Sequence, residues 1–364
     1  MNEAKAARYH RLKRRASIAS VLWNLFLLAG LVGAGQHVRL RDVAERFVPV
    51  APVLGYVLIL SLLHEAGGLP LAFYSGVLLE RRFGLSTERL ASWLGDQAKS
   101  LAIGLVLGGG GASIVYWFIH WSPERWWLPA GLVFAAIIVG LTNLVPVLLL
   151  PLFYSVKPLD HDGLRTRLIA LADRAGARVL GVYEWGLSQK TKKANAALAG
   201  WGATRRILVS DTMLSEYADD EIEVVLAHEL AHHVHGDIWK GIAFESGLVI
   251  AGFYLASQAL ERLAGPLSLR GVGDVAGLPL LLLAAGLVSL GTVPFAHAMS
   301  RGFERSADRF ALDLTHNPSA FISAMRRLGA QNLAEEQPSK LVQWLFYSHP
   351  PIHERIAAAE AFET

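Results

Sequence analysis

The chain has no cysteine among its 364 residues. This absence excludes disulfide bonds, thiolate ligands for a metal ion and a cysteine nucleophile. Any metal ion in the protein must therefore be held by histidine, aspartate or glutamate side chains.

Charged residues are also scarce, at 18% of the sequence against roughly 25% in soluble domains. The formal net charge is only +3, and no long basic run alternates with aromatic residues, which argues against nucleic acid as a partner. Apolar residues make up 53% of the chain, and the surplus falls in long uncharged blocks. Such blocks are typical of membrane-spanning helices, so the lipid bilayer is the first partner that the composition predicts.

Six blocks are long and apolar enough to cross a bilayer, at roughly 20 residues per crossing. They cover residues 17–35, 47–80, 100–121, 128–153, 239–260 and 275–299. The first block follows the basic run "RLKRR" and ends in "GAG", so a cleaved signal peptide is the alternative to a membrane anchor. The fold class expected is a mainly α, multi-pass membrane protein with about six transmembrane helices.

The polar segments between these blocks carry the remaining structure and indicate the topology. Residues 154–238 contain a helical pattern and two runs that are typical of strands, "RVLGVYEW" and "RRILVS". Basic residues at the N-terminus and in residues 80–100 place these regions in the cytoplasm, although the arginines of "HVRLRDVAER" weaken the bias. Alternating spans then place residues 154–238 and 299–364 in the cytoplasm as well.

The stretch "HELAH" at residues 228–232 fits the pattern H-E-x-x-H. On a helix, His228 and His232 share one face with Cβ atoms roughly 5–6 Å apart, which suits two imidazoles on one tetrahedral zinc ion. Glu229 is turned about 100° away, where it can take a proton from a water molecule that the metal activates. The alternative is an amphipathic helix whose histidines are simply solvated.

Two further histidines, His233 and His235, follow the motif but are expected to be bystanders. On a straight helix His235 lies about 10.5 Å along the axis from His228, too far for bonds of about 2 Å to one ion. A third histidine can join such a site where a glycine breaks the helix, but that glycine position is His235 here and the final ligand position is Ile238. The third ligand must therefore come from another part of the chain.

The best candidate segment is "SRGFERSADRFAL", residues 300–312, directly after the last apolar block. Glu304 and Asp308 share one helix face, so Glu304 could complete a His₂Glu site while Asp308 accepts a hydrogen bond from a ligand imidazole. The alternative is a solvated face on which both acids pair with neighbouring arginines, namely Arg301, Arg305 and Arg309.

With these residues the chain resembles the type I CAAX prenyl endopeptidases, a family of integral-membrane zinc metalloproteases. The resemblance covers most of the chain from about Leu69 and includes several blocks in family order. These are "LPLAFYSGVLLERRFGLS", "WLGDQAKSLAIG", "VPVLLLPLFYSVKPL", "VLAHELAHHVHGD", "SRGFERSAD" and "YSHPPIHERI".

The resemblance implies a role for each matching residue. His228, His232 and Glu304 would hold one zinc ion per chain, with Glu229 as general base and Asp308 as the partner of a ligand histidine. In "YSHPPIHER", His349 would lie near the tetrahedral intermediate with Arg355 beside it, where a hydrogen-bond donor aids catalysis. In "KANAALAGWG", Asn195 and Ala196 would pair with the backbone of an extended substrate at a sheet edge.

The resemblance also implies an architecture. Family members of eukaryotes usually have seven spans, which enclose a water-filled chamber with the metal site facing inwards. His64, Glu65 and Glu245 lie at membrane depth, where they either line such a chamber or pair between helices. The implied domains are a membrane domain at 1–153, a zincin-like segment at 154–238 with the edge strand and motif helix, two spans at 239–298, and the end of the catalytic domain at 299–364.

The function expected is that of a membrane-embedded zinc metalloendopeptidase of the CAAX protease type. Its substrate would be a peptide or protein at the membrane, prenylated or not, and the composition suggests a bacterial inner membrane with the site facing the cytoplasm. One alternative is the shorter heat-shock-type membrane protease, against which the block at 69–86 argues. An ion or solute transporter is the alternative of another class, but it gives Glu229 no role, and no internal repeat is visible.

Overall fold

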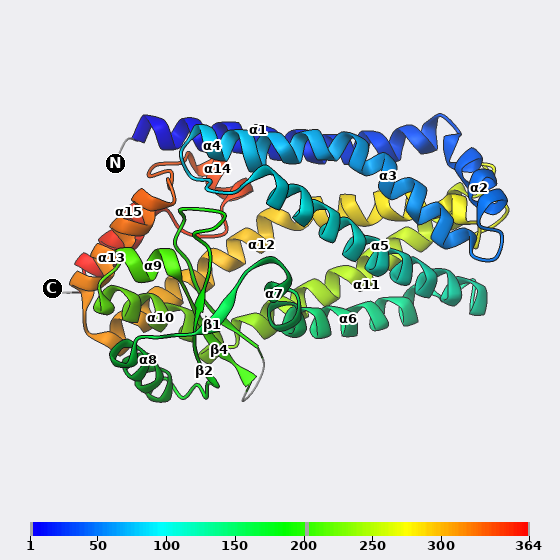
Figure 1. The fold of residues 1–364 in the computed structure, drawn as a ribbon. Helices are drawn as coiled ribbons and strands as arrows, with labels where there is room; N and C mark the ends of the chain where they lie inside the picture. The colour runs from blue at the N-terminus through cyan, green and yellow to red at the C-terminus, as the bar shows by residue number, and fades with distance from the viewer. Residues whose placement is uncertain (1–2, 201–203, 363–364) are drawn as a thin grey trace.

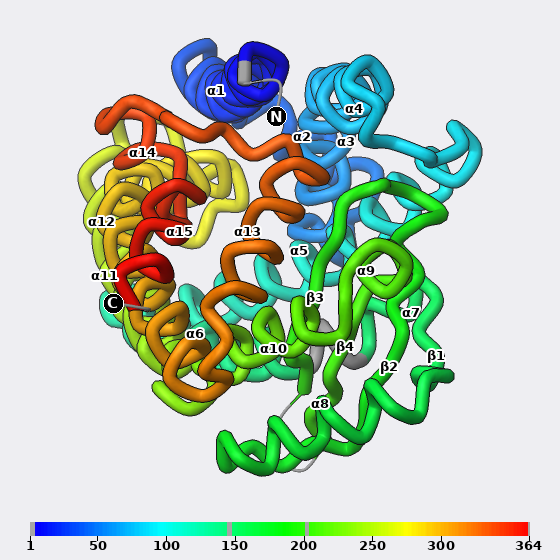
Figure 2. Tube along the Cα trace, turned by 90° about the vertical axis from the view of Figure 1, so that its left-hand side faces the viewer, coloured from blue at the N-terminus to red at the C-terminus, as the bar shows by residue number. Residues whose placement is uncertain are grey.

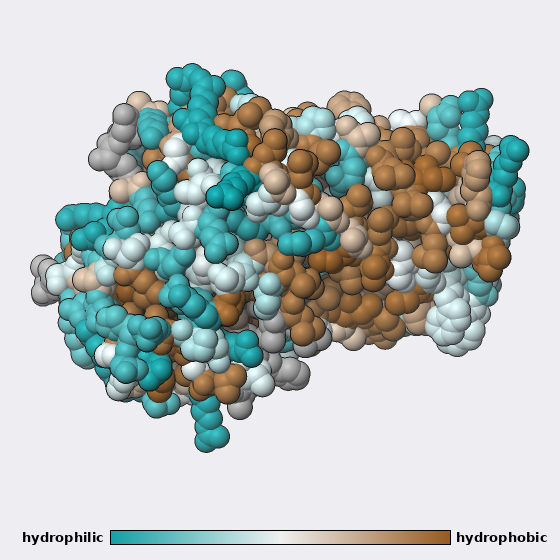
Figure 3. All heavy atoms as spheres, viewed as in Figure 1, coloured by the Kyte–Doolittle hydropathy of each residue, from teal (hydrophilic) through white to brown (hydrophobic). Residues whose placement is uncertain are grey.

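The computed structural model describes residues 3–200 and 204–362, with the side chains of residues 144–147 left out. The molecule is elongated, with long helices running side by side towards one end and a compact α/β part at the other (Figure 1). On the face that Figure 3 draws, apolar side chains cover the helical end and polar ones gather over the α/β part. This distribution fits a membrane domain joined to a domain in water.

Five helical segments of the described chain are long and apolar enough to cross a membrane. They overlap five of the six expected blocks, which confirms those spans by length and composition. The fourth block forms α6, whose apolar part within the described residues, Trp127–Asn143, is shorter. The helices are α1 (Glu3–Gly33), α3 with the π-helical turn η1 and α4 (Pro52–Phe73, Tyr74–Leu78, Leu79–Arg82), α5 (Leu90–Trp121), α6 (Trp127–Leu148), α11 (Asp237–Leu263) and α12 (Leu278–Thr315), with the short helix α2 (Gln36–Phe47) between α1 and α3.

A four-stranded sheet forms the centre of the α/β part, with strand order β1-β2-β4-β3. The inner strands β2 and β4 are parallel, and the outer strands pair antiparallel, so β3 forms an edge. The strands are β1 (Val156–Pro158), β2 (Gly181–Trp185), β3 (Ala196–Ala199) and β4 (Arg206–Ser210). The runs expected as strands thus contain β2 and β4.

Helices cover this sheet and bury one apolar core with it. Helix α10, which carries the histidine motif, packs against β3, α8, α12 and α13. Its apolar side chains, among them Ile222, Leu226 and Leu230, are almost fully buried. The remaining helices are α7 (Leu150–Phe153), α8 (Asp162–Arg174), α9 (Asp211–Glu216), α10 (Asp219–Val234), α13 (Pro318–Gln331), α14 (Lys340–Phe346) and α15 (Ile352–Glu360), with the 3₁₀ turn η3 (Val275–Gly277).

Helix α12 links the membrane domain to the α/β part without a break. The expected boundary at 298/299 falls inside this helix, which continues to Thr315. The part of α12 that carries Glu304 and Asp308 packs against α10, so two segments about 75 residues apart in sequence are brought together. A rigid helix therefore fixes these two carboxylates relative to the membrane.

Candidate metal centre

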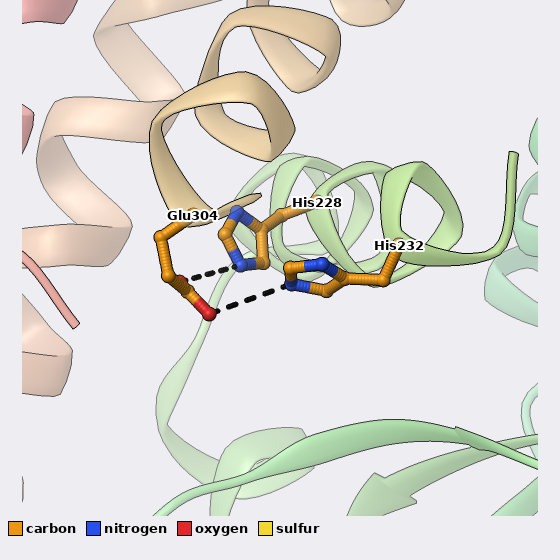
Figure 4. Close-up of side chains that lie close together, drawn as sticks. All are labelled: His228, His232 and Glu304. Carbon is orange, nitrogen blue, oxygen red and sulfur yellow. Dashed lines mark ion pairs between the residues drawn. The ribbon is translucent and has the colours of Figure 1, made fainter. Parts of the chain in front are cut away.

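His228, His232 and Glu304 converge at the contact between α10 and α12 (Figure 4). One ligand atom from each lies within 4.8 Å of the others. The Nε2 atom of His228 is 3.2 Å from Glu304 Oε2, and that of His232 is 3.5 Å from Glu304 Oε1. Two ligand atoms on one tetrahedral zinc ion are about 3.3–3.4 Å apart, because each bond is about 2.0–2.1 Å long.

The other ring nitrogen of each histidine faces a buried carboxylate. His228 Nδ1 is 2.9 Å from Asp308 Oδ1, and His232 Nδ1 is 3.1 Å from Asp237 Oδ2. A carboxylate in this place holds the proton on Nδ1 and leaves Nε2 unprotonated, which is the form that binds a metal ion. The two side chains are therefore oriented as metal ligands.

One oxygen of Glu304 supports the fit of a metal ion to this donor set. Glu304 Oε2 is buried and has no partner with hydrogen-bonding geometry among the described residues. Ring nitrogens of His228 and His349 lie 3.2 and 2.8 Å from it. A buried carboxylate oxygen without a hydrogen bond is costly, and a cation would satisfy it. Two imidazoles and a carboxylate are a donor set that zinc prefers.

Glu229 has the surroundings of a general base. Burial of its side chain raises the pKa of the carboxyl group above its ordinary value. No hydrogen bond or ion pair is assigned to this carboxylate within residues 3–200 and 204–362, so it is free to accept a proton from water. A raised pKa brings the group nearer to neutral pH, where a general base works best.

His349 and Arg355 both reach the centre, but they contact different residues of it. His349 Nδ1 contacts Glu304 Oε2, and its side chain is 61% exposed, so it can meet a substrate. Arg355 was expected beside His349. Its guanidinium instead donates to both oxygens of Asp308, at 2.8 and 2.5 Å, and lies 3.3 Å from His228 Nδ1. We therefore treat Arg355 as a positioning residue for Asp308 and His228.

Two family models match the chain and together cover nearly all of it. Residues 158–363 match peptidase family M48, and residues 2–155 match the CAAX prenyl protease N-terminal region, which is described as five membrane helices. The chain belongs to peptidase family M48.

Relatives of this M48 peptidase align over almost its whole length. The uncharacterized metalloprotease YhfN of Bacillus subtilis is 32% identical, over 99% of this chain and 86% of that protein. CAAX prenyl protease 1 of Saccharomyces cerevisiae is 26% identical, over 98% and 85%. The crystal structure of Ste24p from S. mikatae superposes with a TM-score of 0.88 over 98% of this chain and 89% of that one, at 23% identity.

These comparisons establish the class of protein. The M48 peptidase is a membrane-embedded metalloendopeptidase, a hydrolase of peptide bonds. The expected fold, transmembrane helices joined to a zincin-like domain with a small sheet, is confirmed by the superposition. The match of residues 2–155 argues against the shorter heat-shock-type protease.

A cavity of about 1320 Å³ runs between the transmembrane helices of this M48 peptidase. Its lining is mostly apolar and comes largely from α3, α5, α11 and α12. His64, Glu65 and Glu245 all line it, which fits the chamber expected for them. The lining also includes Asp237 and Phe303, so the cavity reaches the partner of His232 and the residue before Glu304.

The edge strand β3 pairs with β4 on one side and lies next to α10. The backbone N–H and C=O of Asn195 face β4, because they bond to the hydroxyl and N–H of Ser210. In an antiparallel ladder this direction alternates, so the backbone groups of Ala196, which is buried, point away from β4. The side chain of Asn195 is exposed beside them.

The two other histidines of the motif lie outside the convergent group. The ring of His235 packs edge-on against Phe310, with centroids 5.5 Å apart. His233 is half-buried, and burial lowers its pKa below the ordinary value. Neither belongs to the set of donor atoms that could hold a metal ion.

Asp237 is the site residue that the sequence analysis missed. Helix α10 ends at Val234, and Gly236 adopts a left-handed conformation (φ 67°) that starts α11 at Asp237. This tight turn folds Asp237 back under His232. The sequence feature that indicates this role is the dipeptide "GD" directly after the motif. Glycine permits the chain to reverse, and the aspartate can then reach back to the last turn of the motif helix.

Replacing Asp237 with alanine is expected to lower zinc affinity about 10–100-fold, because His232 loses the partner that orients it. Competition with a chromophoric chelator measures this change. Lys240→Ala is the matched control, since it removes the other partner of Asp237 and leaves the contact with His232 intact. Equal zinc affinities of Asp237→Ala and the wild type would show that Asp237 does not support the metal centre.

Proposed function

We propose that this M48 peptidase uses one zinc ion, held by His228, His232 and Glu304, to cleave extended peptides at the membrane surface. The observation that carries the proposal is the convergence of the three donors, each histidine with a carboxylate behind it. A zinc ion at this place supplies a Lewis acid that polarises the scissile carbonyl and lowers the pKa of water.

The residues of the chain supply the remaining steps. Glu229 takes a proton from the attacking water and delivers it to the leaving amine. His349 donates a hydrogen bond to the oxygen on which negative charge develops. Ala196, with Asn195 beside it, binds the substrate backbone as an added strand, because its own backbone groups point away from β4. Asp308 and Arg355 hold His228 in place.

We further propose that preferred substrates carry an apolar, prenyl-like group. The cavity is mostly apolar and reaches the metal centre, so a lipid chain attached to the substrate could occupy it while the peptide lies on β3. Each buried methylene contributes about 0.8 kcal/mol, so a chain of prenyl length offers large binding energy. Two relatives named for CAAX prenyl protease 1, from Saccharomyces cerevisiae and Caenorhabditis elegans, align with 98% and 93% of this chain.

The proposed setting is a bacterial inner membrane with the metal centre facing the cytoplasm. Basic residues gather at the N-terminal end of α1, next to the α/β part in Figure 1. Short basic segments are retained on the cytoplasmic side of a membrane. The segments 154–238 and 299–364 build the centre together and would share this side.

The test compares a farnesylated CAAX-type peptide with the same peptide unmodified. We expect kcat/KM to be at least about tenfold higher for the farnesylated form, because the chain is buried in the cavity. Gly104→Leu should reduce this preference, since Gly104 lines the cavity and has open space in place of a side chain. Gly30→Leu, at an exposed glycine of α1 that does not line it, is the matched control. Equal kcat/KM for both peptides would contradict the prenyl preference and leave the peptidase assignment intact.

A further inference from the structure

We propose that Tyr347 is a positioning residue for His349, and that the first membrane helix takes part in this positioning through Arg14 and Glu335. The inference rests on the proposed role of His349 as a donor to the developing oxyanion. It adds four residues outside the metal centre to the machinery of the reaction, namely Arg14, Arg301, Glu335 and Tyr347.

The segment around His349 needs a constraint on its N-terminal side. Pro350 and Pro351 follow His349, so their rings restrict the backbone on its C-terminal side and favour an extended conformation at His349 itself. The residues before it have no such restriction. Helix α14 ends at Phe346, which leaves Tyr347 and Ser348 to set the direction in which His349 enters the site.

Arg301 fixes the backbone of Tyr347 from inside the protein. This arginine lies one turn before Glu304 on α12 and is buried. Its guanidinium donates to the backbone oxygens of Tyr347, at 2.7 Å, and of Gln343, at 3.2 Å. Gln343 lies in the last turn of α14 and Tyr347 directly follows the helix, so Arg301 binds the C-terminal end of α14. Arg301 thereby ties the start of the His349 segment to the helix that carries the zinc ligand.

Glu335 and Arg14 fix the side chain of Tyr347 from the other direction. The Tyr347 hydroxyl donates to Glu335 Oε2 at 2.5 Å. Arg14 Nη1 donates to the same oxygen at 2.5 Å and to the tyrosine hydroxyl at 3.2 Å. The side chains of Arg14 and Glu335 are only 18% and 12% exposed, so water screens this ion pair much less than a surface pair. The three groups form a closed hydrogen-bonded triangle.

The triangle extends the influence of α1 to the catalytic segment. Arg14 lies near the N-terminal end of α1, just before the first apolar block. His10, one turn earlier, contacts the backbone oxygen of Leu333 at 2.8 Å. Figure 2 shows the chain between α13 and α14 passing α1 at this point. The first membrane helix therefore holds the segment that ends in His349 at two places.

The same turns of α1 also reach the chain next to the edge strand. Lys193, two residues before Asn195, contacts the hydroxyl of Tyr9 and the carboxylate of Glu80, each at 3.0 Å. Lys13 contacts Glu80 at 2.5 Å. One end of α1 thus adjoins both the substrate strand and the His349 segment. Because α1 lies next to both the substrate strand and the His349 segment, this membrane helix can contribute to the geometry of peptide cleavage.

A double-mutant cycle with His349→Ala tests the proposal on the farnesylated peptide. We expect His349→Ala to lower kcat about 10²-fold, and Tyr347→Phe to lower kcat about 10-fold with KM unchanged. In the His349→Ala background, Tyr347→Phe should have no further effect, because both changes remove the same interaction. Zinc content and thermal unfolding are measured on every variant to show that the fold and the metal centre persist.

A charge swap provides a second route to the same answer. Arg14→Glu should lower kcat about 10-fold, because it places two carboxylates beside Tyr347, and adding Glu335→Arg should restore most of the activity. Arg15→Glu is the matched control, since Arg15 is exposed on the same helix and forms no assigned ion pair among the described residues. The control should retain wild-type kcat.

The outcomes separate this inference from the proposed function. If His349→Ala itself keeps wild-type kcat, the proposed role of His349 is wrong and the inference is overturned with it. If His349→Ala lowers kcat but Tyr347→Phe leaves it unchanged, or lowers it by the same factor in both backgrounds, only the positioning role is wrong. Loss of zinc or of cooperative unfolding in Tyr347→Phe would reveal a merely structural role and would also overturn it.

Discussion

Glu229→Gln is expected to lower kcat by roughly 10²–10⁴-fold while the protein keeps its zinc ion. Glutamine has the shape of glutamate but cannot accept the proton of the attacking water or carry it to the leaving amine. The residue is not among the three metal donors, so metal content should stay at about one ion per chain. Peptide cleavage and elemental analysis of the same preparation measure both quantities.

Glu223→Gln is the matched control for this prediction. Glu223 lies on the same helix and pairs with Arg167 on the side of α8. Its replacement should leave kcat within about twofold of the wild type, because a partly exposed ion pair contributes little to the structure. Undiminished cleavage by Glu229→Gln would show that Glu229 is not the general base.

Glu304→Ala is expected to abolish both zinc binding and cleavage. A site with two imidazoles alone holds zinc far less tightly than one with three protein ligands, so metal content should fall from about one ion per chain to below about 0.1 after dialysis. The loss of activity should follow the loss of metal and should not be reversed by micromolar zinc. Elemental analysis after dialysis, with activity assayed before and after zinc addition, measures this outcome.

Asp313→Ala is the control on the same helix. Asp313 pairs with Arg309 on an exposed face of α12, away from the donors. Its replacement should leave zinc content and kcat unchanged. A Glu304→Ala protein that keeps a full zinc ion would show that the third ligand is another residue.

Local sequence patterns were sufficient for the parts of the fold that depend on neighbouring residues. The apolar blocks predicted five spans that the structure contains, since hydropathy over about 20 residues decides membrane insertion. The spacing of "HELAH" predicted that His228 and His232 share one helix face, because residues four positions apart are neighbours on the surface of a helix. The i, i+4 pair of Glu304 and Asp308 made Glu304 a candidate ligand, and the resemblance to a known family supported it, but its distance to α10 is set by the packing of α12 and not by any local pattern.

Features that depend on tertiary contacts could not be derived in this way. Arg355 was expected near His349, yet its hydrogen bonds go to Asp308, because α15 packs against α12 on that side. Asp237 was missed because its role depends on the reversal at Gly236. The triangle of Arg14, Glu335 and Tyr347 joins residues more than 300 positions apart, and no periodicity reports such a contact.

The most direct test of the central claim is anomalous scattering at the zinc edge from crystals of the wild-type protein. The account predicts one peak per chain, about 2.0–2.2 Å from His228 Nε2, His232 Nε2 and a carboxylate oxygen of Glu304. A peak on His233 or His235, or a protein that cleaves peptides with no peak at this centre, would contradict it.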